Sequence, residues 1–387
     1  MKRLLLAFSA FVLTVGLWEL GCFLYPVRHQ MDNPWYTFIG HDALSASRDL
    51  PFERPPHFTW TGSSRGDLAV LHKDRDPYAK KVTFKTDFQG FRNDTDIREA
   101  DIIFIGDSYT EAGNIDTDKG FVQLVGQRLQ RSVRNLGRAV YAPPHELVVL
   151  SKYGLPCKPK LVVWQIAEAN DLNESAMYEG WRQSGRPYFE STGAGRTTPA
   201  EAWQRRSPTM RLVSMLRKPN PYPVTGTFSS KDGQRYPIRF FAALPGRAQT
   251  PRGHPGTPVM SRALDDGIQT LTEAGIPCIF LLIPTKHHVM ADAVELAEHT
   301  RRNMDSYQPI PEQERMAAQL TMYFELKGTT FIDATQALKT AADEGELVYI
   351  PFDTHLNERG HKIVADLLVK SIAKMLPGPD QSITATP

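Results

Sequence analysis

The stretch Asp101-Ile-Ile-Phe-Ile-Gly-Asp-Ser-Tyr-Thr-Glu111 decides the fold. Its four consecutive apolar residues, 102–105, predict a short strand buried on both faces, as in a parallel sheet. Similar apolar runs follow, and segments with helical periodicity lie between them. The predicted strands cover residues 101–107, 132–136, 161–166, 278–283 and 329–332. Strands that alternate with helices predict an α/β domain in which helices cover both faces of one parallel five-stranded sheet.

The composition is that of a globular protein. Of 387 residues, 41% are hydrophobic and 23% are charged, which excludes wholesale disorder. The formal net charge of +2 gives no reason to expect a nucleic-acid partner. Three cysteines, Cys22, Cys157 and Cys278, are too few for a disulfide scaffold or a four-cysteine zinc site. We expect buried thiols at Cys157 and Cys278, with a disulfide between them as the alternative.

An apolar run follows two basic residues at the N-terminus. Lys2 and Arg3 precede residues 4–25, whose helical length of roughly 33 Å would cross a hydrocarbon core of about 30 Å. We interpret residues 1–26 as a signal anchor that forms one transmembrane helix. The expected location is the inner (cytoplasmic) membrane, with the rest of the chain on the extracytoplasmic, periplasmic side. A cleaved signal peptide and lipidation at Cys22 are the alternatives.

Three further segments are defined by composition. Residues 27–98 are interpreted as a stalk and irregular cap, residues 99–376 as the α/β domain, and residues 377–387 as a disordered tail. Inside the domain, residues 176–258 hold 11 Pro and 9 Gly and carry a net charge of +9. We expect an insertion with a hairpin at Asp232-Gly233. It is either a solvated loop or, through arginines such as Arg205 and Arg206, a lid or dock for an anionic glycan or lipid.

Ser108 is the first candidate functional residue. It follows the first predicted strand directly, so it lies at the carboxyl edge of the sheet, where α/β proteins bind ligands. The free N–H groups of a helical turn at this point would stabilise a tetrahedral oxyanion. The neighbours Asp107 and Tyr109 are candidate substrate contacts. The alternative role of Ser108 is a helix N-cap.

Other candidate residues lie at the same edge. Asn170 follows the third strand and can donate to the same oxyanion, or form an Asx turn. Asp353-Thr-His355 precedes the last predicted helix, 358–376. His355 can act as general base and Asp353 can orient its imidazole, unless Asp353 only caps the helix. Lys286, after the fourth strand, is a candidate substrate contact or an ordinary surface lysine.

In this order the motifs resemble the SGNH/GDSL hydrolase superfamily, over about residues 100–375. Ile105-Gly-Asp-Ser108 is similar to its nucleophile block and Asn170-Asp171 to its asparagine block. The resemblance implies a flavodoxin-like three-layer α/β/α fold and a serine esterase with catalytic Ser108, Asp353 and His355. It also implies an oxyanion hole built from the Ser108 N–H, a glycine N–H and the Asn170 side chain.

The sequence departs from the family pattern at two places. The family's glycine position holds Val140, unless the register shifts toward Gly137. The spacing Asp353-Thr-His355 replaces the usual Asp-x-x-His. That spacing is similar to the alginate-acetylation branch, whose members are extracytoplasmic and move acetyl groups onto exopolysaccharide.

These features predict a membrane-anchored extracytoplasmic serine esterase that acts on O-acyl or O-acetyl esters, with a glycan as the expected carrier, through an acyl-serine. The first alternative is an O-acetyltransferase for an exopolysaccharide or envelope glycan. The second is a non-catalytic glycan-binding or assembly protein. The sequence contains no phosphate-binding loop, dinucleotide glycine fingerprint or His-x-x-x-His pair, so we expect no cofactor and no metal.

Overall fold

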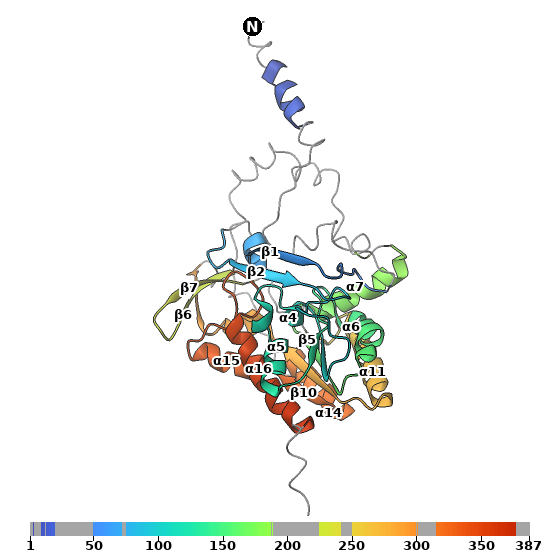
Figure 1. Cartoon of the computed structure of the whole chain (residues 1–387). Helices are drawn as coiled ribbons and strands as arrows, with labels where there is room; N and C mark the ends of the chain where they lie inside the picture. The colour runs from blue at the N-terminus through green and yellow to red at the C-terminus, as the bar shows by residue number, and fades with distance from the viewer. Residues whose placement is uncertain are drawn as a thin grey trace, which may run out of the picture.

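The structure is a computed structural model of the whole chain (Figure 1). It describes residues 3, 9–11, 13–19, 49–71, 75–186, 188, 224–240, 250–298, 300 and 315–376.

The predicted five-stranded parallel sheet forms the centre of the fold. Its strands lie in the order β10-β8-β5-β3-β4, which is 5-4-3-1-2 when they are numbered along the chain, the flavodoxin-like order. All four pairings are parallel, so the carboxyl ends of the strands meet at one edge. The strands are β3 (Ile102–Ile105), β4 (Val133–Asn135), β5 (Leu161–Ala167), β8 (Cys278–Ile283) and β10 (Thr330–Asp333).

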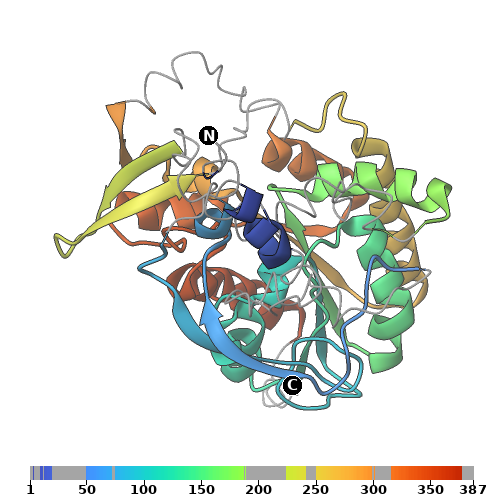
Figure 2. The same ribbon diagram turned by 90° about the horizontal axis from the view of Figure 1, so that it is seen from above.

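Helices cover both faces of this sheet, as Figure 2 shows. Successive side chains of a strand point to opposite faces, so Ile102 and Phe104 pack into one hydrophobic cluster and Ile103 and Ile105 into another. The first cluster includes residues of α5 (Phe121–Leu129), α15 (Thr335–Asp343) and α16 (Glu358–Met375). The second includes residues of α6 (Pro143–Val149), α11 (Thr257–Glu273) and α14 (Met316–Lys327). The fold is therefore the three-layer α/β/α arrangement expected.

Shorter helices lie at the ends of strands or between the larger elements. They are α3 (Asp67–Leu71), α4 (Ser108–Glu111), η1 (Thr117–Lys119), η2 (Leu150–Gly154), η3 (Leu155–Cys157) and α12 (Lys286–Met290). Helix α7 (Asp171–Ser184) is longer and follows β5 directly.

The described residues between 49 and 98 pack as an ordered layer on the α/β domain, which differs from the irregular cap expected. β1 (Thr59–Ser64) pairs antiparallel with β2 (Lys80–Lys85) along its full length. Arg54 is 5% exposed and forms an ion pair with Glu111 of the α/β domain. The proline-rich sequence around these strands carries no periodic signal that would have predicted the pairing.

The insertion contains the predicted hairpin. β6 (Val224–Ser229) and β7 (Arg235–Phe240) pair antiparallel across a turn in which Gly233 has a φ of +76°. β9 (Val294–Leu296) adds a third strand beside β6. Arg205 and Arg206 lie outside the described residues, as do residues 189–223, 241–249 and the predicted tail 377–387.

The N-terminal anchor stays a prediction. Helical backbone is described at residues 3, 9–11 and 13–19, and the other positions of 1–26 lie outside the described residues. Among the residues that are described, no helix has the length and apolar character needed to cross a membrane.

Both described cysteines are free thiols, so the alternative of a disulfide between them is not realised. Cys157 is buried, whereas Cys278 is only partly buried.

Candidate active site

Ser108 lies where β3 has ended and α4 begins. The carboxylate of Asp107, the preceding residue, accepts a hydrogen bond from the Tyr109 N–H at 2.9 Å. Gly106 makes the turn between strand and helix with a φ of +156°, and a Cβ at this position would meet Thr110 Oγ1 at 2.4 Å. Only glycine fits so close an approach, and the turn places Ser108 at the carboxyl edge of the sheet.

Ser108, His355 and Asp353 form one hydrogen-bonded chain. His355 Nε2 lies 2.8 Å from Ser108 Oγ, and His355 Nδ1 lies 2.6 Å from Asp353 Oδ1. Since an ionised carboxylate only accepts hydrogen bonds, Nδ1 donates to Asp353, and in the neutral imidazole Nε2 is free to accept a hydrogen bond from the Ser108 hydroxyl. The structure therefore brings together the three residues that the sequence predicts as nucleophile, general base and orienting acid.

The electrostatics of the pair favour a charged imidazolium. Burial lowers the pKa of His355, but the charge and hydrogen bond of Asp353 outweigh it and raise this pKa to about 9. Burial raises the pKa of Asp353, and the facing His355 with its hydrogen bonds more than offsets this, so the pKa lies below its usual value. Asp353 therefore remains ionised and favours the protonated form of the His355 imidazole.

Donors for an oxyanion come from the loops after β3, β4 and β5. Asn170 directly precedes α7, but its side chain does not cap that helix. Val140 has a φ of +71°, a left-handed conformation that favours glycine, and its N–H has no backbone or side-chain acceptor in the described part of the chain. The Gly137 N–H, in contrast, donates to Asn135 Oδ1 at 2.8 Å. Val140 therefore fits the family's glycine position better than Gly137 does.

Buried carboxyl groups gather near Asn170. Burial, reinforced by repulsion between the groups, raises the pKa of Glu146 and of Asp171. Burial also raises the pKa of Asp107 and takes that of Glu174 to about 8, while hydrogen bonds from Asn170 counteract both rises. Glu174 is consequently protonated at neutral pH. This protonation reduces the negative charge that would otherwise repel an oxyanion beside Asn170.

Asp107 and Tyr109, expected as substrate contacts, are buried and bonded within the chain. Asp107 is fully buried, and its Oδ2 lies 3.3 Å from Ser108 Oγ. The Tyr109 hydroxyl donates to the Thr354 carbonyl oxygen at 3.1 Å, and its ring centroid lies 5.0 Å from that of His355. Both residues therefore support the catalytic groups instead of facing a substrate.

Lys286 also differs from its expected role. Its Nζ is buried and donates to the carbonyl oxygens of Ile350, Pro351 and Asp353 at 2.8, 2.7 and 3.0 Å. Burial lowers the pKa of Lys286 to about 7, although Asp353 and Asp67 act in the opposite direction. This lysine holds the segment that leads to Asp353.

Sequence reasoning missed two residues that contact Asp353. Asn114 Nδ2 donates to Asp353 Oδ2 at 2.7 Å, and the backbone N–H of Asp67 donates to the same oxygen at 3.3 Å. Asp67 lies 286 residues from Asp353 in the chain, in the stretch expected to be irregular. Its only local signal is a position just after a run that forms a strand.

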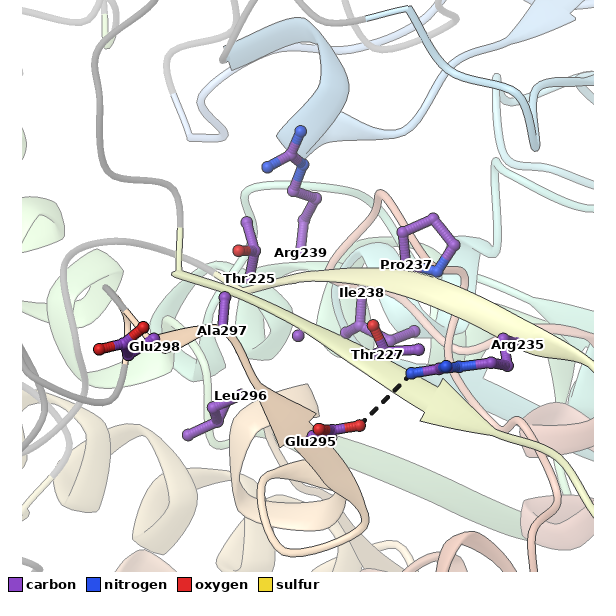
Figure 3. A pocket seen from close by; sticks show the side chains of 11 residues that line it. Thr225, Thr227, Arg235, Pro237, Ile238, Arg239, Glu295, Leu296, Ala297 and Glu298 are labelled. Carbon is purple, nitrogen blue, oxygen red and sulfur yellow. Dashed lines mark hydrogen bonds and ion pairs between the residues drawn. The ribbon is translucent and has the colours of Figure 1, made fainter.

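A hollow of about 600 Å³ lies on the three-stranded sheet of the insertion (Figure 3). Arg235 and Glu295 line it and form an ion pair, with 3.4 Å between Arg235 Nη2 and Glu295 Oε2. The Arg239 side chain points away from this pair. The Arg239 guanidinium lies 5.1 Å from the ring centroid of Phe352, the residue before Asp353. Arg239 is thus a residue of the hollow's lining that also contacts Phe352.

One group in the described part of the chain has the composition of a metal site. Asp67, Asp353 and His355 bring three ligand-type atoms within 4.8 Å of one another. His355 Nδ1 and Asp353 are already hydrogen-bonded to each other, and a cation among the three groups would displace the proton that joins them. The geometry thus favours proton transfer at this cluster, and we assign no metal to it.

The C-terminal part of the chain matches a known family. Residues 246–386 match the family described as the SGNH hydrolase-like domain of the acetyltransferase AlgX. This range contains Asp353 and His355, whereas Ser108 and Asn170 precede it. No curated protein matches the chain.

The comparison with solved structures found matches at low identity and low TM-score. An acetyl xylan esterase, AlAXEase, has 13% identity and a TM-score of 0.36, covering 70% of this chain and 98% of its own. A GDSL-like lipase from Bacteroides thetaiotaomicron has 10% identity and a TM-score of 0.34, covering 71% and 88%. A catalytic mutant of Axe2, an acetylxylan esterase from Geobacillus stearothermophilus, has 16% identity and a TM-score of 0.36, covering 70% and 93%.

The family match falls on the part of the chain where the Asp353-Thr-His355 spacing was found similar to the alginate-acetylation branch. The sequence resemblance and the match therefore agree. Residues 246–386 are thus similar to the SGNH hydrolase-like domain of the acetyltransferase AlgX, a class of enzymes that act on ester bonds.

Proposed function

We propose that the protein removes O-acyl groups, chiefly O-acetyl groups, from glycan esters through an acyl-serine at Ser108. One observation carries the proposal. Ser108 Oγ, the His355 imidazole and the Asp353 carboxylate are joined by contacts of 2.8 and 2.6 Å, in the order that base-assisted nucleophilic attack requires.

The acylation step follows from these contacts. His355 Nε2 takes the hydroxyl proton while Ser108 Oγ attacks the ester carbonyl carbon. The N–H groups of Ser108 and Val140 and the Asn170 amide stabilise the resulting oxyanion, each donor contributing roughly 3 kcal/mol. The carbon–oxygen bond to the sugar then breaks, and His355 returns the proton to the departing sugar oxygen. The acyl group remains on Ser108.

The second step defines two candidate activities. If water attacks the acyl-serine, with His355 again as base, the enzyme is an esterase. If a sugar hydroxyl attacks, the enzyme is an O-acetyltransferase, and the match to the AlgX acetyltransferase family favours this second candidate. The hollow on the three-stranded sheet supports a glycan acceptor, because its threonine hydroxyls and charged groups of both signs suit hydrogen bonds to sugar hydroxyls.

We also propose that residues 1–26 anchor the enzyme, with the catalytic domain outside the cytoplasmic membrane. The basic pair at residues 2 and 3, followed by the apolar run 4–25, supports this orientation.

Release of nitrophenolate from nitrophenyl acetate by the full-length chain tests the acyl-serine. Ser108→Ala should lower the enzymatic rate by roughly 10⁴-fold or more. Ser151→Ala is the matched control, since the Ser151 hydroxyl only donates to the Leu147 carbonyl oxygen on an exposed surface, and it should retain the wild-type rate. Equal rates in wild type and Ser108→Ala would refute the proposal.

A partition experiment separates the two candidates. The acyl-enzyme is formed from the same ester in the presence of an unacetylated oligosaccharide, and acetate and acetylated sugar are both quantified. Acetylated sugar that increases with acceptor concentration supports transfer, whereas acetate alone supports hydrolysis.

A further inference from the structure

The start of α3 is docked onto the catalytic segment. The backbone N–H of Ala69 donates to the Phe352 carbonyl oxygen at 3.1 Å, and that of Asp67 donates to Asp353 Oδ2 at 3.3 Å. A Cβ at Gly66 would lie 2.0 Å from the Phe352 carbonyl oxygen, so the two backbones meet at a distance that only glycine allows. Helix α3 therefore has a fixed position against residues 352–354.

The Asp67 side chain accepts hydrogen bonds from Thr354, the residue between Asp353 and His355. Asp67 Oδ1 accepts the Thr354 N–H at 2.9 Å, and Oδ2 accepts the Thr354 hydroxyl. Two hydrogen bonds donated to one carboxylate fix both the backbone and the side chain of Thr354. A residue of α3, far away in the sequence, thereby fixes the tripeptide 353–355.

The same carboxylate faces the imidazole. Asp67 Oδ2 lies 3.9 Å from His355 Nδ1, and the Asp67 side chain is 32% exposed. An opposite charge at about this distance favours the protonated imidazole. Asp67 is thus a second negative charge beside the base, in addition to Asp353.

We propose that Asp67 is a positioning residue of the catalytic centre, which fixes Thr354 and adds a second carboxylate that stabilises the imidazolium of His355. This inference rests on the proposed function, because it assumes that His355 is the base for Ser108. It extends that function to a segment outside the predicted α/β domain, since Asp67 precedes residue 99.

Other groups also act on His355. Asp353 and Asp107 raise its pKa together with Asp67, and burial lowers it. The Tyr109 ring packs on the imidazole. Burial, followed by the charges of Arg92 and His355, lowers the pKa of the neighbouring His361. Burial, followed by the charge of Asp353, raises the pKa of Asp67 itself to about 6, so Asp67 is ionised above that pH. The Asp67 charge is therefore present at the pH values where His355 loses its proton.

The test uses the pH dependence of Ser108 labelling by a fluorophosphonate in the full-length chain. Ser108 Oγ forms a bond to phosphorus, fluoride leaves, and His355 takes the hydroxyl proton, so the rate rises with pH as the imidazole becomes neutral. Asp67→Asn should move the half-maximal pH down by about one unit, the lower end of the range for a charge at this distance. The limiting rate should fall by about tenfold, since the imidazolium loses a neighbouring charge.

Two controls separate charge from position. Thr354→Val removes the hydroxyl that Asp67 holds and keeps the charge, so it should lower the limiting rate without moving the half-maximal pH. Asp118→Asn changes the net charge equally but lies on an exposed turn beside Lys119, and should match wild type. The proposal is overturned if Asp67→Asn keeps the wild-type half-maximal pH, whatever its limiting rate.

A titration that needs no activity separates this inference from the proposed function. In Ser108→Ala, the His355 Cε1–H resonance is followed by NMR with pH, with and without Asp67→Asn. A lower imidazole pKa in the double variant supports the inference even if wild-type Ser108 is not labelled, an outcome that would refute only the acyl-serine.

If Asp67→Asn does not fold, Asp67→Glu replaces it. The glutamate keeps the charge and should keep the wild-type half-maximal pH with a lower limiting rate, and a lower half-maximal pH would overturn the proposal.

Discussion

Arg54 and Glu111 form a bidentate ion pair inside the molecule. Arg54 Nε and Nη2 lie 2.9 Å from Glu111 Oε1 and Oε2, and both side chains are 4% exposed. Glu111 is the last residue of α4, whose first residue is Ser108. The pair therefore ties the layer of residues 49–98 to the helix that carries the nucleophile.

Removal of one partner of this pair should destabilise the fold strongly. Arg54→Met leaves the Glu111 carboxylate buried without its counter-charge, which should cost about 3–5 kcal/mol of unfolding free energy. Arg54→Met with Glu111→Leu should cost less, because neither charge remains. Urea unfolding measures both values.

Arg128→Met is the control, since Arg128 pairs with the half-exposed Asp366 and should lose at most about 1 kcal/mol. An Arg54→Met variant no less stable than Arg128→Met would show that the buried pair is not required.

Asn170→Ala should slow acylation without unfolding the protein. The Asn170 side chain does not cap α7, so its removal leaves no helix N–H newly unpaired. Loss of one oxyanion donor lowers kcat by about 10²–10³-fold. The measurement is the rate of nitrophenyl acetate hydrolysis, with the melting temperature as the check on folding.

Asn173→Ala, on the exposed first turn of the same helix, is the matched control and should keep the wild-type rate. Equal activity of the two variants would remove Asn170 from the oxyanion hole.

Local patterns predicted the elements that depend on local sequence. The continuous apolar run 102–105 followed by Ser108 predicted both a buried strand and a polar residue at its carboxyl end, and the structure has both. The short spacing of Asp353 and His355 likewise placed two side chains at one turn. A continuous apolar run and a two-residue spacing depend only on neighbouring residues. These features could therefore be predicted without knowledge of distant contacts.

Features that depend on distant contacts could not be predicted. Asp67 reaches Thr354 across 287 residues, and nothing in its neighbours indicates that partner. Lys286 was expected to be either a substrate contact or an ordinary lysine after a strand, because a sequence does not reveal that its Nζ turns inward to three carbonyl oxygens. The left-handed backbone conformation of Val140 could not be predicted either, because valine rarely adopts this conformation.

The backbone of Val140 leads to a prediction about stability. A valine with a φ of +71° carries about 1–2 kcal/mol of strain, which Val140→Gly relieves. Glycine loses more conformational entropy on folding, which offsets about 0.5–1 kcal/mol of this gain. The lost valine side chain contributes little, because it is only partly buried. The unfolding free energy should therefore change by at most about 1 kcal/mol, and activity should persist because the donor is the backbone N–H.

Val163→Gly is the contrasting variant. Val163 is fully buried in β5, so its loss should cost more than about 3 kcal/mol from burial and strand entropy combined. Equal losses at the two positions, measured by urea unfolding, would mean that Val140 is not strained.

Stability and activity should change in opposite directions with pH because of His355. Its pKa in the folded protein is about 9, above the ordinary value of 6.5, so protonation favours the folded state. The stabilisation is fully present below about pH 6.5 and is lost as the pH rises through about 9, which amounts to up to about 3 kcal/mol. Nitrophenyl acetate hydrolysis, which needs neutral imidazole, should increase over the same interval.

The comparison is between wild type and His355→Gln, with urea unfolding measured at each pH. The unfolding free energy of wild type should fall relative to the variant between pH 6.5 and 9.5. A difference that stays constant across this interval would mean that His355 does not gain a proton more readily in the folded protein, and its coupling to Asp353 would then have to be weaker than their 2.6 Å contact indicates.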